Sequence, residues 1–375
     1  MMLPPILFSV VGALLIFVVL WEAFETIVFP RRVTRRIRLT RLMFSTTWSA
    51  WKRIARLLPQ GHRENMLSIY GPLSLLLWLT LWATMLIVSF GLLHHGSTGG
   101  VNGFGPSLYF SGSNFFTLGL FQPLSPLTRF LAVTEAGTGL GFLAIVIGYL
   151  PALNQSFSRR EVNISLLDSR AGSPPTAAEM LRRHSDEHGM ESIRQLLHEW
   201  ERWSAELLES HLSYPVLAYF RSQHENQSWL AALTCVLDAG AFVMVGLEGA
   251  CTRQAQLTFA MARHAIVDLC LIFRLRPVSQ SPERLLPETL AILRSGLAEA
   301  GLRPRTGKDA DLKLSELRSL YEPYLFALSQ YFGLALPPWT PEAEATDNWQ
   351  TSEWSQGAKV INGIASRARA RPHFR

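Results

Sequence analysis

The sequence predicts an all-α protein with a membrane-embedded amino-terminal part and a helical soluble part. Two observations support this prediction. Hydrophobic residues make up 48% of the 375-residue chain and its mean hydropathy is +0.16, which is high for a wholly soluble protein. Long apolar runs dominate residues 1–160, whereas the later sequence shows apolar residues at helical spacing and no alternating strand pattern.

Charge and motifs narrow the function classes. The net charge is +6, but the arginines lie beside the apolar runs and not along a groove-sized helix, so we expect membrane lipid and not nucleic acid as a partner. The sequence lacks a phosphate loop, a dinucleotide fingerprint and a nucleophile elbow, so we expect neither an enzyme nor a cofactor. Cys235, Cys251 and Cys270 match no zinc or redox spacing and are expected to be buried thiols.

Residues 1–30 contain the first predicted transmembrane helix, from residue 6 to residue 29. A cleaved signal peptide is the alternative. No positive charge precedes the run, the run is too long for a signal core, and Pro30-Arg31-Arg32 follows where a small-residue cleavage site would be. Glu22 and Glu25 could lie at the membrane interface or could face a protein partner.

Residues 31–67 form a basic linker that we expect in the cytoplasm. Residues 31–66 contain ten Lys and Arg residues against a single acid, Glu64. Apolar residues recur there at roughly helical spacing, so part of the linker could lie as an amphipathic helix on the inner leaflet. A solvated loop is the other interpretation.

The next predicted spans are residues 69–93 and 130–153, and residues 94–128 between them carry no Lys, Arg, Asp or Glu. Arg159 and Arg160 follow the third span. The positive-inside rule therefore predicts a multi-pass protein of the plasma or inner membrane, with its amino terminus outside and its carboxyl terminus inside. A fourth apolar run, 229–249, holds Asp238, which costs about 2.5–3.5 kcal/mol on insertion scales, so we expect a buried helix of the soluble part.

The uncharged segment predicts a re-entrant pore helix. Gly105-Pro106 can start a short helix, and residues 107–116 supply about three turns. The negative end of the helix dipole would then favour a cation. Thr117 to Leu120 are expected to run extended, so that the Thr hydroxyl and successive carbonyls can replace the water around an ion.

Residues 68–160 resemble the potassium channel superfamily, in its bacterial branch with one pore loop per subunit and a cytoplasmic carboxyl-terminal domain. The matching residues are Thr117-Leu118-Gly119 at the filter entry and Thr134 to Leu143 in the inner helix. The resemblance implies that this chain, with its three predicted transmembrane helices, is a homotetrameric channel subunit whose inner helix lines the cavity and whose permeant monovalent cation is K⁺. It also implies a selectivity filter of Thr117, Leu118, Gly119, Leu120 and Phe121.

The second half of the filter departs from the family pattern. Phe121 replaces the second glycine and Gln122 replaces the aspartate. A residue with a Cβ disfavours the backbone conformation required there, so we expect altered upper ion sites. The alternative function is a non-conducting, membrane-anchored sensor or scaffold on a degenerate channel fold.

The inner helix carries the remaining candidate site residues. Glu135 could support the filter through hydrogen bonds to the Ser111, Ser113 or Thr117 hydroxyls, or it could be an interfacial residue. Three glycines could provide close packing or a hinge for a gate. They are Gly137, Gly139 and Gly141.

Residues 159–336 are predicted to form an all-α cytoplasmic domain, preceding a flexible tail over 337–375. Thr176 and Glu179 form a capping box. Further helices are expected at 215–224, 228–250, 254–275, 282–301 and 311–333. Buried acids are expected to pair with nearby cations: Asp238, Glu248 and Asp268 with Arg253, His264 or Arg274. His184 and His188 could hold a metal, but surface histidines are commoner and no metal site is predicted.

Overall fold

The computed structural model describes residues 4–28, 39–99, 103–120, 125–185, 189–224, 226–249 and 251–341. Secondary structure in these ranges is helical and contains no strand; an isolated bridge joins Leu247 and Pro304. The predicted all-α fold is thus confirmed for this part of the chain. The chain forms two compact units, Met1–Gln155 and Ser156–Arg375, which are described separately.

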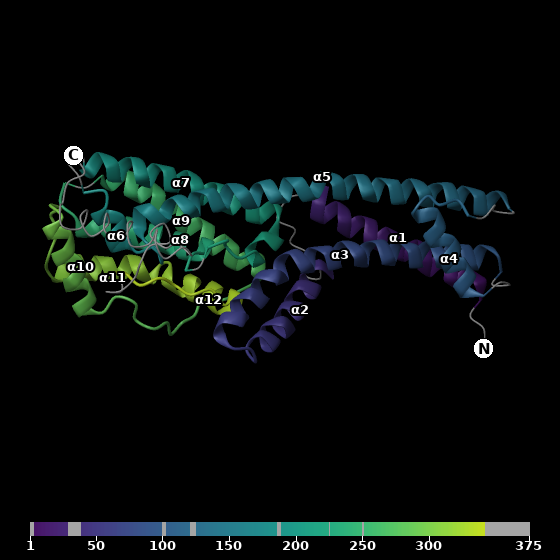
Figure 1. Ribbon diagram of the computed structural model, residues 1–375, viewed down its shortest axis with the longest axis horizontal. Helices are drawn as coiled ribbons and strands as arrows, with labels where there is room; N and C mark the ends of the chain where they lie inside the picture. Colours follow the sequence, from purple (N-terminus) through teal and green to yellow (C-terminus); the bar gives the residue numbers. More distant parts are fainter. Residues whose placement is uncertain are drawn as a thin grey trace, which may run out of the picture. The chain divides into compact units, whose positions relative to one another are not determined.

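In the first unit, α1 (Pro5–Ala23) lies along α3 (Gln60–Ser97) (Figure 1). Two glycines allow the backbones to approach closely. A Cβ on Gly12 would lie 2.6 Å from the Ser89 carbonyl oxygen, and a Cβ on Gly96 would lie 2.7 Å from that of Pro5. Small residues at a contact are typical of helix packing in membranes, where close backbone approach supplies the attraction.

The basic linker contains a helix, α2 (Leu39–Ala55), which packs on α3. Trp48 is buried against Tyr70, with ring centroids 4.7 Å apart, and the Trp51 indole nitrogen donates to the Met66 carbonyl at 2.9 Å. Glu22, at the end of α1, accepts a hydrogen bond from the Thr40 backbone nitrogen at 3.0 Å, so it caps α2. The segment is therefore a packed helix, whereas its contact with a membrane stays a prediction.

The third predicted span belongs to a much longer helix, α5 (Pro126–Ala171), which continues from the first unit into the second. The sequence between Arg159 and Ala171 contains no glycine or proline to end a helix. The helix ends only before Gly172, which has φ 86°. Residues 161–171, after the third predicted span, are consequently part of the same helix.

Five helices in the described ranges are long and apolar enough to cross a membrane: α1, α3, α5, α8 (Trp229–Gly246) and α9 (Thr252–Phe273). Their surroundings differ. Only 11% of the most apolar window of α5 is buried in protein, against 89% for α8. The chain thus has several apolar helices compatible with a multi-pass membrane protein, and α8 is enclosed by protein.

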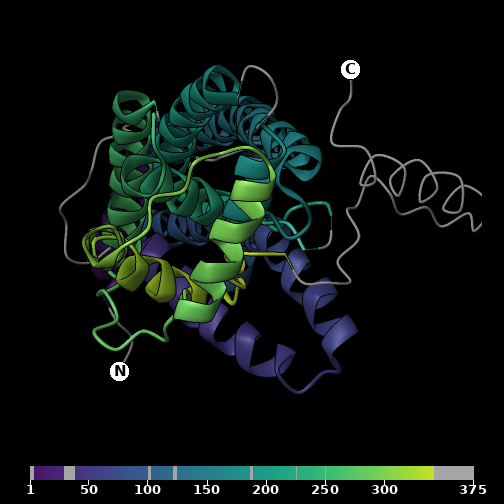
Figure 2. The same cartoon turned by 90° about the vertical axis from the view of Figure 1, so that its left-hand side faces the viewer.

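The second unit packs helices around α8 (Figure 2). The helices that contact α8 are α6 (Ala177–Arg182), α7 (Gly189–Ser213), α9, α11 (Lys308–Ser319) and α12 (Glu322–Phe332), and α10 (Pro287–Glu299) packs on α6. Figure 2 views them nearly end-on, with α10 lying across them. Half of the predicted capping box is present at the start of α6: the Thr176 side chain accepts from the Glu179 backbone nitrogen at 3.3 Å, whereas the Glu179 carboxylate accepts from Arg182 and Arg183.

Three predicted boundaries in this unit were wrong. The helix expected at 311–333 is divided into α11 and α12, because Pro323 lies in the first turn of α12. The helix expected at 215–224 is a short 3-10 turn, η2 (Pro215–Tyr219). The first residues of the predicted flexible tail are packed: Trp339 is fully buried and its carbonyl accepts from the Ala178 nitrogen at 3.1 Å.

The buried acid of α8 finds a partner that was not expected. Asp238 forms a bidentate ion pair with Arg284, at 2.7 and 3.2 Å, and accepts from the Tyr321 hydroxyl at 2.6 Å. Arg284 also donates to Glu322 at 3.2 Å and to the Pro337 carbonyl at 2.8 Å. The network joins α8, α12 and the segments around Arg284 and Pro337, so the Asp238 charge is compensated inside the protein.

The other two acids that were expected to be buried differ, since Asp268 is buried and Glu248 is exposed. Asp268 lies 3.4 Å from His264 on the next turn of α9, which is one of the anticipated pairs. The three cysteines are free thiols; Cys235 and Cys270 are buried and Cys251 is half-buried.

Candidate functional site

The candidate site is the short helix α4 (Phe104–Phe115) with the turn that follows it. Gly103, at φ 76°, and Pro106 start the helix. Its polar side chains are turned inward: Ser107, Ser111, Ser113 and Asn114 are buried, whereas Tyr109 is exposed. A helix in water shows the opposite arrangement.

The end of α4 closes in a helix-terminating turn made by Thr117. The Thr117 nitrogen donates to the Asn114 carbonyl at 2.9 Å, and the Leu118 nitrogen donates to the Ser113 carbonyl at 2.8 Å. This pair of bonds is a Schellman motif, whose left-handed position is usually glycine. Here it is a β-branched residue, Thr117, with φ 59°. Such a conformation costs on the order of 1–3 kcal/mol and is typical of functional sites.

The expectation that Thr117 to Leu120 run extended was wrong. Gly119 is left-handed as well, with φ 63°, so the segment turns twice in four residues. The Leu120 backbone nitrogen donates to the Ser113 hydroxyl at 3.2 Å, which fastens the turn to α4. Leu118 and Leu120 are exposed. Phe121 and Gln122, the departures from the family pattern, lie outside the described residues.

Glu135 of α5 contacts α4 through Ser111 and is fully buried. Its Oε1 contacts the Ser111 hydroxyl, and its Oε2 lies 3.0 Å from Nε2 of His94 in the last turn of α3. The structure therefore brings Glu135 to one of the three hydroxyls considered from the sequence, and it does not place this carboxyl at an exposed interface. Three helices meet at this residue.

The sequence interpretation missed His94. It is 2% exposed and lies 41 residues before Glu135 in the chain. Its one visible signal is its place as the first polar residue after the apolar run of the second span. A histidine there is as typical of a membrane interface as of a buried network, so only its contact with the Glu135 side chain in the folded chain identifies it.

Of the three inner-helix glycines, Gly139 makes a close contact. A Cβ at this position would overlap the Phe115 carbonyl oxygen in the last turn of α4. A Cβ on Gly137 or on Gly141 would meet no atom within 4 Å. Gly139 consequently allows α5 to touch the end of α4, whereas the other two glycines face open space in the single chain.

The histidine pair considered for a metal is not assembled in the described part. His184 Nδ1 lies 2.8 Å from the Met180 carbonyl, and His188 lies outside the described residues. The described ranges contain no group of three His, Cys, Asp or Glu residues that could hold a metal ion.

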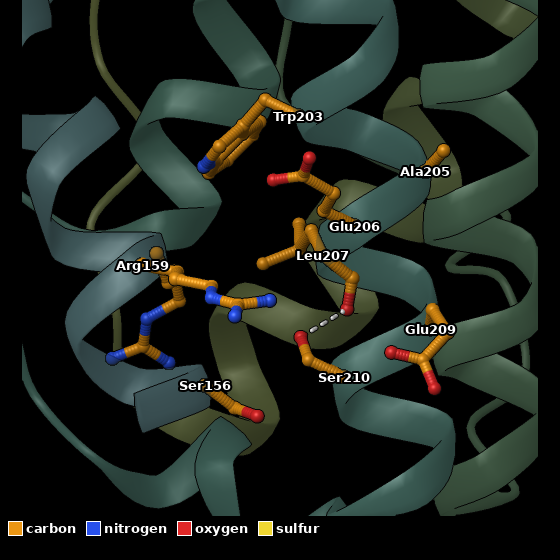
Figure 3. A pocket seen from close by; sticks show the side chains of 9 residues that line it. Ser156, Arg159, Trp203, Ala205, Glu206, Leu207, Glu209 and Ser210 are labelled. Carbon is orange, nitrogen blue, oxygen red and sulfur yellow. Dashed lines mark hydrogen bonds between the residues drawn. The ribbon is translucent and has the colours of Figure 1, made fainter. Parts of the chain in front are cut away.

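A second candidate is a cleft of about 340 Å³ between α5 and α7 in the second unit (Figure 3). Arg159 on α5 and Glu206 and Glu209 on α7 line it, with Trp203 forming one wall. Arg160 also lines the cleft, but its guanidinium donates to the Leu217 and Phe220 carbonyls, each at 2.9 Å, and to Glu161. The charges that remain are mixed, so the cleft does not indicate one class of ligand.

Comparisons of the chain with protein-family models, curated proteins and solved structures found no match. Function is therefore inferred from residues and geometry. The strained turn after α4 and the buried contacts of Glu135 are the features of the described residues that are hardest to explain by packing alone.

Proposed function

We propose that the chain is one subunit of a potassium-channel-like cation channel in which four copies surround an ion path. The observation that carries this proposal is the placement of α4, a short helix with buried hydroxyls, against the two long apolar helices α3 and α5. The carbonyl end of α4 leads into the strained turn at Thr117. A helix end of this kind provides a negative potential for a cation.

The filter would consist of Thr117 to Phe121. Gly119 adopts a left-handed conformation that a residue with a Cβ disfavours, which supports a requirement for glycine at this position. Phe121 stands where the family pattern has its second glycine, so we propose a monovalent cation pathway with weaker preference for K⁺ over Na⁺ than a complete filter would give.

The proposed assembly is supported by the exposed apolar surface of the single chain, and the proposed topology by its basic residues. Large apolar side chains of α5 are exposed in the single chain, among them Phe130, Val133 and Leu140. An apolar hollow of about 440 Å³ also lies beside α4, lined in part by Tyr109 and Phe116. Neighbouring subunits and lipid would cover these surfaces in a homotetramer. We also propose that α2 and the second unit lie in the cytoplasm of a plasma- or inner-membrane protein, because basic residues flank the apolar runs on that side.

A second function is favoured by one specific observation. The replacement of the family's glycine and aspartate by Phe121 and Gln122 would suit a protein that has kept the pore architecture without conduction. In that case the second unit would act as a membrane-anchored sensor or scaffold.

The test is ion flux into liposomes containing the purified full-length chain. We expect K⁺ flux that falls by about tenfold or more in Gly119→Val, because each subunit would then hold a β-branched residue in a left-handed conformation. Phe121→Gly combined with Gln122→Asp should raise the K⁺ to Na⁺ permeability ratio. Lys313→Ala, an exposed change on α11, is the matched control and should leave flux unchanged.

Two results would contradict these proposals. A folded oligomer that passes no ions under changes of voltage, membrane tension and pH would support the scaffold and refute the channel. Unchanged permeability ratios in the double variant would refute the assignment of Phe121 and Gln122 to the filter.

A further inference from the structure

The contacts of the Ser111 hydroxyl limit where protons can lie. Its Oγ is 2.7 Å from the Ile87 carbonyl of α3 and also contacts Oε1 of Glu135. A hydroxyl has one hydrogen to donate, and a carbonyl can only accept. If Ser111 donates to Ile87, the hydrogen between Ser111 and Glu135 must belong to the carboxyl group.

The contacts of His94 limit where a proton can lie on the other side of the Glu135 carboxyl group. Nε2 lies 3.0 Å from Oε2 of Glu135, and Nδ1 is buried without a hydrogen-bond partner in the described ranges. A hydrogen on Nδ1 would therefore be a buried, unpaired donor, which is rarer in proteins than an unpaired acceptor. The neutral tautomer with its hydrogen on Nε2 avoids this cost, so His94 donates to Glu135.

We propose that His94, Glu135 and Ser111 form a neutral, one-way hydrogen-bond relay that positions α4, and that His94 is a positioning residue of the pore. His94 Nε2–H donates to Glu135 Oε2, the Glu135 carboxylic acid donates from Oε1 to Ser111 Oγ, and Ser111 donates to the Ile87 carbonyl. The relay starts and ends on α3 and passes through α5 and α4. Every group in it is uncharged.

The alternative arrangement is an ion pair between a histidinium and a carboxylate. It would bury two charges, at side chains that are 2% and 0% exposed, between helices that we propose to span a membrane. It would also leave the Nδ1 hydrogen unpaired. Among the described residues, His94 is the group capable of positive charge that lies within ion-pair distance of Glu135. The neutral relay satisfies the same contacts without these costs.

The relay bears on conduction because Ser111 lies on α4 six residues before Thr117. Fixing Ser111 against α3 and α5 sets the position of α4, and of the strained turn after it, along these two helices. This consequence rests on the proposed channel function, whereas the protonation of Glu135 does not.

Paired variants separate the relay from an ion pair. In Glu135→Gln the amide can still donate to Ser111 and accept from His94, so we expect K⁺ flux within about twofold of the unchanged chain. Glu135→Ala removes both bonds and should reduce flux by about tenfold. His94→Gln, which keeps a donor, should likewise conduct better than His94→Leu. Ion-pair behaviour, in which Glu135→Gln is as damaging as Glu135→Ala in a folded oligomer, would overturn the relay.

Infrared spectroscopy tests the relay without any need for conduction or for a damaging variant. The difference spectrum between the unchanged chain and Glu135→Gln, both in liposomes at neutral pH, should show the carbonyl band of a protonated carboxylic acid that shifts in D₂O. A carboxylate band in its place would refute the relay. If the acid band is present but the unchanged chain passes no ions, the relay stands and the channel proposal fails.

Discussion

Two buried acids, Glu135 and Asp238, lie on apolar helices of their respective units, and each is 0% exposed. Asp238 contacts a guanidinium in a bidentate pair with Arg284 and a hydroxyl from Tyr321. Glu135 contacts a histidine and a serine, His94 and Ser111. The acid in the second unit is thus compensated by a full positive charge, and the acid in the first unit by groups that can be neutral.

The difference follows from what surrounds each helix. The apolar window of α8 is 89% buried in protein, so its neighbours can supply an arginine and the further partners that the arginine needs. The corresponding window of α5 is 11% buried and exposes apolar side chains. An arginine there would have few partners, and a neutral hydrogen-bonded acid is the less costly solution. An acid within an apolar run of the sequence therefore does not by itself indicate how its charge is compensated in the fold.

The largest expected effect comes from removing the charge that compensates Asp238. Arg284→Met should destabilise the second unit by about 3–5 kcal/mol, because it leaves a buried carboxylate without its partner. Denaturant unfolding of the full-length chain in detergent, followed by tryptophan fluorescence, would measure this. Arg294→Met is the control: its partner Asp311 is half-exposed, so we expect a loss of at most about 1 kcal/mol. Equal effects of the two changes would contradict the comparison.

A buried histidine of the second unit extends the comparison to pH. Burial, and next the charge of Arg160, lower the pKa of His211 from 6.5 to about 3. Between these values the unfolded chain binds a proton that the folded chain does not. The free energy of unfolding should therefore fall by about 1.4 kcal/mol for each pH unit as the pH drops below 6.5.

Unfolding titrations of the full-length chain and of His211→Phe test this pH dependence. The variant should lose the His211 component of the slope while keeping that of other groups. An identical slope in both proteins would show that His211 does not remain neutral in the folded state.

The contact between α4 and α5 gives the next largest effect. Gly139→Ala places a Cβ on the Phe115 carbonyl, and relieving such an overlap costs about 1–3 kcal/mol. We expect a lower thermal stability of the oligomer in detergent and reduced ion flux. Gly141→Ala, which meets no atom within 4 Å, should change neither. If both variants behave alike, the close approach of α5 to the end of α4 is not important for assembly.

The smallest effect concerns backbone strain at the candidate filter. Thr117→Gly removes a β-branched residue from φ 59° and should stabilise the turn by up to about 1 kcal/mol. Under the channel proposal the same change should reduce flux, since the Thr hydroxyl is lost from the ion path. Thr117→Ser retains the hydroxyl and is expected to conduct better than Thr117→Gly. A gain in both stability and flux would indicate that Thr117 is not a filter residue.

The sequence predicted the start of a helix well where neighbouring residues alone determine it. Pro106 and the glycines beside it mark the start of α4, and the Thr176 and Glu179 pair marks the start of α6, because caps depend on neighbouring residues. The same reasoning failed at Thr117, where hydrogen bonds to α4 hold a β-branched residue in a left-handed conformation that its own preference opposes. It also failed at Trp339, which belongs to a polar segment but fills the core of the second unit.

The sequence by itself determined the helical class, the positions of the apolar helices and the short helix α4 between two of them, because hydrophobic periodicity and caps act over a few residues. Only the tertiary structure decided how the buried acids are satisfied. Arg284 lies 46 residues from Asp238, and His94 lies 41 residues from Glu135. Nearer cations were available in the sequence, but a buried charge is compensated by whichever group the packing brings within hydrogen-bond distance. That distance is a property of the fold and not of the spacing along the chain.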